Sequence, residues 1–129
     1  MAFEIPIVGG AVSTFKAEAT LATKQFYFAE MGTAADEVDL CDNAGDLVLG
    51  VIQNKPAAGE AVQLRCYGVS KVVASGAITR GARVGTDASG KAVTKSADAD
   101  LVAGIALETS TTDGDLIAVL LTPAAQRAS

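Results

Sequence analysis

The sequence contains no histidine, no tryptophan and only two cysteines, Cys41 and Cys66. Without histidine, the chain lacks the commonest general base, a frequent metal ligand and a member of the Ser-His-Asp triad. Neither a CxxC nor an HExxH motif is present to bind a metal. We therefore predict that the protein is not an enzyme and has no catalytic, cofactor-binding or metal-binding residues.

The two cysteines are also too few for the disulfide framework of a small secreted domain. A free cysteine packs as a small hydrophobic residue. We expect two buried or half-buried thiols in a protein made in a reducing cytoplasm, rather than a disulfide.

Basic runs and long apolar runs are absent as well. Ten Lys and Arg residues stand against fifteen Asp and Glu residues, which gives a net charge of −5. Nucleic-acid affinity depends on Lys and Arg displacing counterions, so we predict no nucleic-acid partner. No stretch approaches 18 consecutive apolar residues, and the first ten residues lack the basic segment of a signal peptide. We therefore expect neither a membrane span nor a signal peptide.

Aromatic residues are few, with two Tyr and four Phe in 129 residues. The apolar side chains are mostly Ala and Val, which bury little surface each, at about 25 cal/mol per Å² of apolar area. A chain of this length forms one domain or two small lobes that share a core. We therefore expect partner subunits to contribute to stability.

Glycine-rich turns recur at short, regular spacing between β-branched segments, which is typical of many short antiparallel strands. We predict an all-β fold, a small β-sandwich or barrel built from two related hairpin-rich lobes, with an extended N-terminal arm. The strands are expected near residues 3–8, 12–20, 26–30, 47–54, 61–66, 69–74, 82–86, 91–94, 101–108 and 115–121.

Two segments of the chain resemble each other. DLVLGVI, with Gly50, and DLVAGIA, with Gly104, are each followed by a second turn, at Gly59-Glu60 and at Gly114-Asp115. A duplicated β-unit cannot bury its apolar face alone, so two copies packing together would form one core. We predict an arm or edge strand at 1–10, a single β domain at 11–122 with pseudo-repeated halves at about 15–66 and 70–121, and a C-terminal tail at 123–129.

Two segments partly match known binding motifs, a phosphate-binding loop and an EF-hand calcium loop. Residues 85–92, GTDASGKA, fit GxxxxGK, but Ala92 stands where a phosphate-binding loop needs Ser or Thr, so we predict a hairpin turn. The acidic segment 36–46, DEVDLCDNAGD, lacks EF-hand spacing, since Ala44 occupies loop position 3, which must provide a ligand, when Asp42 is counted as position 1. We expect solvated loop acids there, with a weak ion site as the alternative.

The N-terminal segment AFEIPIV places Phe3, Ile5 and Ile7 on one face, while Pro6 cannot donate within a central strand. Such an arm can add to the sheet of a neighbouring subunit. The candidate interface arm consists of Phe3, Ile5, Pro6, Ile7 and Val8. An ordinary first strand in its own sheet is the alternative.

The FYF segment contains three of the six aromatic residues of the sequence. We expect Phe26 and Phe28 in the core and Tyr27 on the opposite face, with an exposed Tyr27 at a subunit contact as a variant. A carbohydrate- or ligand-binding β module remains a functional alternative, for which Tyr67 or Tyr27 would provide the stacking ring.

Residues 45–122 contain a series of turn and strand motifs in a characteristic order. They are Gly50, Gly68, Ser75-Gly76-Ala77-Ile78, Gly104-Ile105-Ala106-Leu107-Glu108 and Gly114-Asp115-Leu116-Ile117. In this order the chain resembles the capsid decoration, or cement, proteins of tailed bacteriophages. None of the motifs is catalytic.

The resemblance implies an all-β homotrimer on the outer surface of the phage head, where it binds the major capsid protein and stabilises the expanded shell. The protein would be present in the host cytoplasm during assembly. A head-fibre base or a tail component of the same virion is the alternative.

Overall fold

The computed structural model describes residues 11–12, 15–97 and 100–127, and all their regular elements are strands. The strands are β1 (Ala11–Val12), β2 (Lys16–Ala17), β3 (Phe28–Met31), β4 (Glu37–Leu40), β5 (Gly50–Ile52), β6 (Leu64–Arg65), β7 (Gly68–Val73), β8 (Arg83–Thr86), β9 (Ala92–Thr94), β10 (Leu101–Ala106) and β11 (Leu116–Arg127). The predicted all-β fold is confirmed. Within these described ranges, no helix is long and apolar enough to span a membrane.

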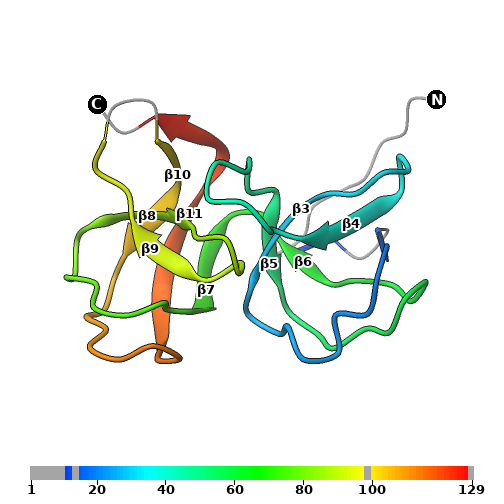
Figure 1. Cartoon of the computed structure of the whole chain (residues 1–129), viewed down its shortest axis with the longest axis horizontal. Coiled ribbons are helices and arrows are strands. Elements are labelled where there is room, and N and C mark those ends of the chain that lie inside the picture. Colours follow the sequence, from blue (N-terminus) through cyan, green and yellow to red (C-terminus); the bar gives the residue numbers. More distant parts are fainter. Residues whose placement is uncertain (1–10, 13–14, 98–99, 128–129) are drawn as a thin grey trace.

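The strands form two sheets, which lie side by side along the long axis of the molecule (Figure 1). Sheet A has six strands in the order β1-β6-β5-β3-β4-β2, and sheet B has five in the order β7-β11-β10-β8-β9. All strand pairs are antiparallel except β2 with β4. Sheet A comes from the first half of the chain and sheet B from the second half. That the two halves arose by duplication stays a prediction.

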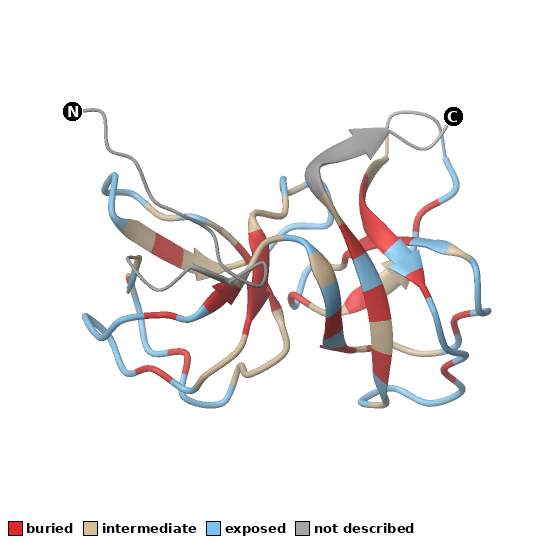
Figure 2. Ribbon diagram, turned by 180° about the vertical axis from the view of Figure 1, so that it is seen from behind, coloured by how far each residue is buried: buried red, intermediate tan, exposed pale blue. Residues whose placement is uncertain are grey.

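Two clusters of buried side chains form the core (Figure 2). One cluster lies within sheet A and includes Leu21, Val38 and Ile52. The other belongs mainly to sheet B, but Phe28 and Val51 of sheet A are part of it, and both are fully buried. Because one cluster contains side chains of both sheets, separating the sheets would expose the core.

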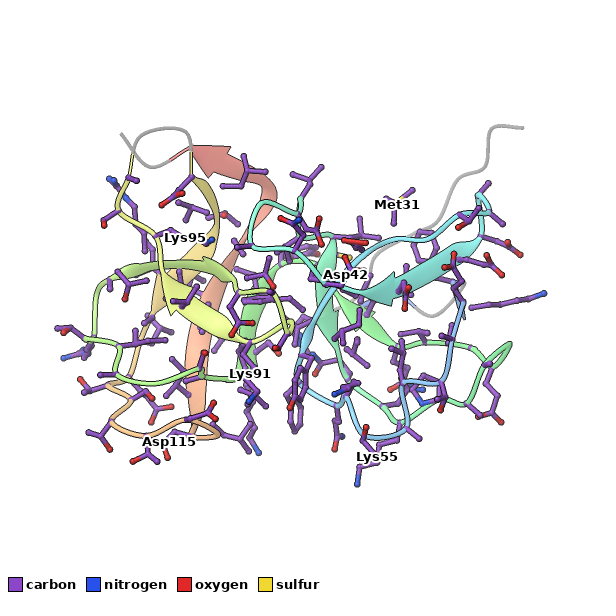
Figure 3. All side chains as sticks on the ribbon, viewed as in Figure 1. Met31, Asp42, Lys55, Lys91, Lys95 and Asp115 are labelled. Atoms are coloured by element: carbon purple, nitrogen blue, oxygen red, sulfur yellow. The ribbon has the colours of Figure 1, made fainter. Side chains whose placement is uncertain are left out.

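Backbone and side-chain hydrogen bonds also join the two sheets. The Phe28 N–H donates to the Gly90 carbonyl at 2.8 Å, and the Val73 N–H donates to the Phe26 carbonyl at 3.0 Å. The ammonium of Lys95, which is only 8% exposed, donates to the Ala44 carbonyl at 2.8 Å. Lys95 lies in the sheet B half and Asp42, near Ala44, in the sheet A half (Figure 3). The two halves are therefore tied together at several points of one junction.

Three local predictions need correction. The acidic segment 36–46 is not all loop, because β4 occupies its first part, with Val38 fully buried between Glu37 and Asp39. The single strand expected at 12–20 is divided into β1 and β2. Strand β11 continues to Arg127, so residues 123–127 belong to a strand that pairs with β10 rather than to a tail.

Acidic residues close five of the turns with the same pair of hydrogen bonds. In each turn, the backbone N–H of the acid donates to the carbonyl three residues earlier, and its carboxylate accepts the N–H of that earlier residue. The distances lie between 2.7 and 3.2 Å. This reciprocal arrangement is like a helix capping box, in which an acid satisfies an otherwise unpaired donor. The acids are Glu37, Asp46, Glu60, Asp100 and Asp115.

Candidate functional site

The predicted interface arm, Phe3, Ile5, Pro6, Ile7 and Val8, lies outside the described residues. Its docking onto a neighbouring subunit therefore stays a prediction. The described part of the chain begins at β1, which is an edge strand of sheet A.

The segment that imitates a phosphate-binding loop is the turn of the β8–β9 hairpin, as predicted. One carboxylate oxygen of Asp87 accepts the N–H groups of Ser89 and Lys91, at 2.8 and 2.9 Å. Gly90 has φ +82°, and a Cβ there would lie 2.6 Å from Leu40 Cδ1. Glycine is thus required both by the turn and by its close packing on sheet A. The donors of this loop bind its own aspartate instead of facing an anion.

The acidic segment takes part in a cluster at the junction of the halves. Oxygens of Glu30 and Asp46 and the sulfur of Cys41 all lie within 4.8 Å of one another. Burial, a hydrogen bond to Asp46 and nearby negative charges raise the pKa of Glu30 to about 7. The pKa of Asp46 is lowered although burial opposes this, because Glu30 and two backbone N–H groups donate to its carboxylate. Glu30 therefore holds the proton that the two carboxyl groups share.

The Cys41 thiol adds little to this cluster as a metal donor. Burial, helped by the neighbouring carboxylates, raises its pKa far above the usual range. Metal binding by cysteine requires the thiolate. Both cysteines are free thiols, with Cys41 buried and Cys66 half-buried, as expected from the sequence.

The FYF segment departs from strand alternation. Phe28 is fully buried, as predicted, but Phe26 is only half-buried, with φ +70°, and belongs to neither core cluster. The Phe26 N–H donates to the Ile52 carbonyl of sheet A and the Phe26 carbonyl accepts the Val73 N–H of sheet B, so its strained backbone bridges the two sheets. Tyr27 packs partly against the sheet A core, with the Lys24 ammonium 4.9 Å from its ring centre. The positive φ at Phe26 explains why the predicted alternation fails here.

A shallow hollow of about 520 Å³ lies next to Phe26. Its apolar lining includes Phe26, Tyr27, Val73 and Leu116, and Lys55 contributes a charge. The other tyrosine, Tyr67, is 39% exposed just before β7. The hollow is open, and no reactive pair of side chains lines it.

Sheet B carries an apolar outer surface, here called the sheet B face. Its register places Ile105 beside Leu120 and Leu120 beside Val69, in one row across β10, β11 and β7. These three side chains are 37%, 41% and 51% exposed. The sheet B face comprises Val69, Ile105, Leu107, Leu116 and Leu120, all between 37% and 51% exposed.

Two cations accompany these apolar residues. Lys71 is paired with Ala118, and Arg83 is paired with Ile105, so their side chains share the sheet B face. Glu108 lies beside this face, where it accepts the Ala118 N–H at 2.7 Å. Soluble monomers rarely expose contiguous apolar surface of this kind without an interaction partner.

Sequence reasoning missed the sheet B face, although a signal was present. Residues 116–121, LIAVLL, are apolar on both faces of β11. A strand with one solvated face usually alternates between apolar and polar residues, and a continuous apolar run indicates two covered faces. Only the inner face, with Ile117 and Val119, is covered by the described chain. The run therefore predicts a second, external cover.

Comparisons with known proteins gave a family match and a similar solved structure. A family model described as phage cement protein matches residues 7–121. Among solved structures, the chain is similar to the head fiber gp8.5 N base of bacteriophage phi29, with a TM-score of 0.65 and 20% identity over 90% of this chain and 98% of that chain. At this identity, the likeness supports the fold alone. A search of curated proteins gave no significant match.

The family match extends over both sheets and the junction that joins them, and the predicted resemblance to phage cement proteins is confirmed. The chain belongs to the phage cement protein family and is thus a structural protein of a phage virion.

Proposed function

We propose that the protein binds the outer surface of the phage head, contacts the major capsid protein and stabilises the expanded shell. The observation that carries this proposal is the cement-family match over residues 7–121. The joined sheets fit such a role, because a protein that holds neighbouring capsomers together must resist being pulled apart itself. The shared core cluster and the hydrogen bonds across the junction provide that resistance.

We further propose that it acts as a homotrimer, made in the host cytoplasm and added to the head during assembly. A trimer would present three identical contacts to the shell, and simultaneous contacts raise the effective affinity well above that of one contact. The sheet B face supports self-association, since it leaves large apolar side chains uncovered in the single chain.

Sedimentation with purified capsids tests the proposal. The protein should sediment with expanded capsids and remain in solution with unexpanded ones, and electron microscopy should show added density at threefold positions. Loaded capsids should also survive higher temperature than bare ones. Equal binding to both capsid forms, or no binding to either, would refute the cement role.

A head-fibre base is the second candidate. It is favoured by the structural similarity to the phi29 head fiber N base, of which 98% is covered. The same micrographs distinguish the two roles. A fibre base would appear as isolated projections to which a further protein attaches, whereas a cement protein would occupy a regular lattice over the whole shell.

A further inference from the structure

The sheet B face holds five of the eight large apolar side chains that are exposed in the described chain, and its two cations restrict what can cover it. We propose that it binds the acidic β3–β4 end of a second copy, so that subunits join head to tail and close into a ring. This inference rests on the proposed function only in taking the protein to be an oligomer. The occupant is another copy of this chain, not the capsid protein.

Charge is distributed unequally between the two halves. Residues 11–66 contain eight acidic and four basic residues, a net charge of −4, whereas residues 67–129 contain six of each, a net charge of zero. Around the β3–β4 hairpin, Asp36 is exposed and lies 3.8 Å from the Lys16 ammonium, and Glu37 and Asp39 are half-exposed. The chain therefore carries both an apolar surface with cations and an acidic surface that complements it.

The arrangement of charges favours a head-to-tail contact over a symmetric one. In a twofold pair, the same surface of both copies meets. Arg83 and Lys71, whose ammonium lies 5.8 Å from the centre of the Phe26 ring, would then enter one apolar interface from both copies, where a charge without an opposite partner is costly. Glu108, which accepts the Ala118 N–H beside this face, provides only one negative charge against these two cations. A head-to-tail contact instead places both cations opposite carboxylates.

The positions of the two surfaces fit this arrangement. Strands β7, β11 and β10 lie side by side in one half of the molecule, and the β3–β4 hairpin lies at the far end of the other half (Figures 1 and 2). Met31, 54% exposed at the end of β3, lies on the side of sheet A away from sheet B (Figure 3). It offers an apolar contact beside the acids. One chain cannot satisfy its own face, so a neighbour is required.

Leu120 is the residue to test, because it lies in the middle of the row between Ile105 and Val69. Buried central residues contribute most of the affinity of an interface. Leu120→Glu should abolish association of the full-length chain in sedimentation velocity and light scattering. The matched control is Leu47→Glu, which alters a leucine that is 57% exposed but lies outside the sheet B face. It should leave association unchanged, and circular dichroism and thermal unfolding should show that both variants are folded.

A charge exchange identifies the partner surface. Lys71→Glu should weaken self-association by about tenfold, as expected for loss of a close interfacial charge pair. Adding Asp36→Lys and Asp39→Lys to the same chain should restore it. Association of the unmodified protein should also weaken as NaCl increases, since salt screens opposite charges. Failure of the exchange to restore association would exclude the β3–β4 end as the partner.

Capsid binding separates this inference from the proposed function. If Leu120→Glu remains oligomeric but no longer sediments with capsids, the face belongs to the capsid contact and the inference is wrong, while the cement role stands. If Leu120→Glu becomes monomeric but no form of the protein binds capsids, the inference stands and the cement role fails. An unmodified chain that stays monomeric at all concentrations, free and on capsids, would overturn the inference.

Discussion

Neutralising Glu30 should stabilise the protein above neutral pH. The pKa of its carboxyl is raised from 4.5 to about 7, first by burial and then by Asp46, Asp42 and Asp39. A group whose pKa is higher in the folded state stabilises the fold fully below its unfolded pKa and loses that contribution as pH rises through the folded pKa. Stability of the unmodified protein should therefore fall as pH rises from about 4.5 to about 7.

The size of the effect follows from the shift. Each pKa unit corresponds to about 1.4 kcal/mol, so the full shift would correspond to roughly 3 kcal/mol. Glu30 is partly exposed, and solvent screening reduces this to about 1–2 kcal/mol. In Glu30→Gln, the amide can still donate to Asp46 but carries no charge. At pH 8 we expect a gain of that size, or about 4–8 °C in Tm.

Urea and thermal unfolding of both forms at pH 4 and pH 8 measure this difference. At pH 4 the two proteins should be nearly equal, because Glu30 is then mostly protonated in both the folded and the unfolded state. Asp36→Asn, which removes an exposed carboxylate outside the cluster, should not reproduce the pH-dependent gain. A gain of equal size at both pH values would show that the shared proton is not its source.

Three further predictions concern other parts of the chain. Gly104→Ala should lower the free energy of unfolding by at least about 2 kcal/mol, the cost of overpacking a core, because the new Cβ would lie 2.3 Å from the Leu120 carbonyl oxygen. Chemical denaturation measures this loss of stability. Lys91→Ala should change stability by under about 0.5 kcal/mol, since it removes only a surface ion pair with Asp113, and a nucleotide-binding assay should detect no affinity to lose. Deleting residues 2–8 should weaken trimer assembly or capsid binding, and unaltered values of both would exclude the arm hypothesis.

Most of the fold could be predicted because turn chemistry marks the strand ends. Gly90 and Gly114 have positive φ values in turns where the sequence indicates them. Strand β4 was missed because its acids favoured a loop, although Glu37-Val38-Asp39-Leu40 alternates between polar and apolar residues. The buried Val38 shows that alternation was the better indicator.

The junction could not be predicted, since it depends on contacts between distant segments. Lys95 and Ala44 are 51 positions apart, and nothing in either local sequence indicates that a buried ammonium donates to that carbonyl. The positive φ of Phe26 is equally unexpected, because aromatic residues rarely adopt it. Packing of the two lobes against each other imposes both the Lys95–Ala44 hydrogen bond and the positive φ of Phe26. Local sequence patterns therefore cannot predict either one.

The turns that are closed by acidic residues provide evidence on the origin of the two halves. When the two similar segments of the chain are aligned, Asp46 matches Asp100 and Glu60 matches Asp115. All four residues close their turns with the same reciprocal hydrogen bonds. Equivalent turns at aligned positions support duplication of one β-unit, which stays a proposal. The halves now differ in charge, with a net −4 in residues 11–66 and zero in residues 67–129. A head-to-tail ring requires two unlike surfaces on every subunit. Sequence divergence of two duplicated halves would supply both surfaces, an acidic one on the first half and an apolar one on the second, while the two halves still share a core.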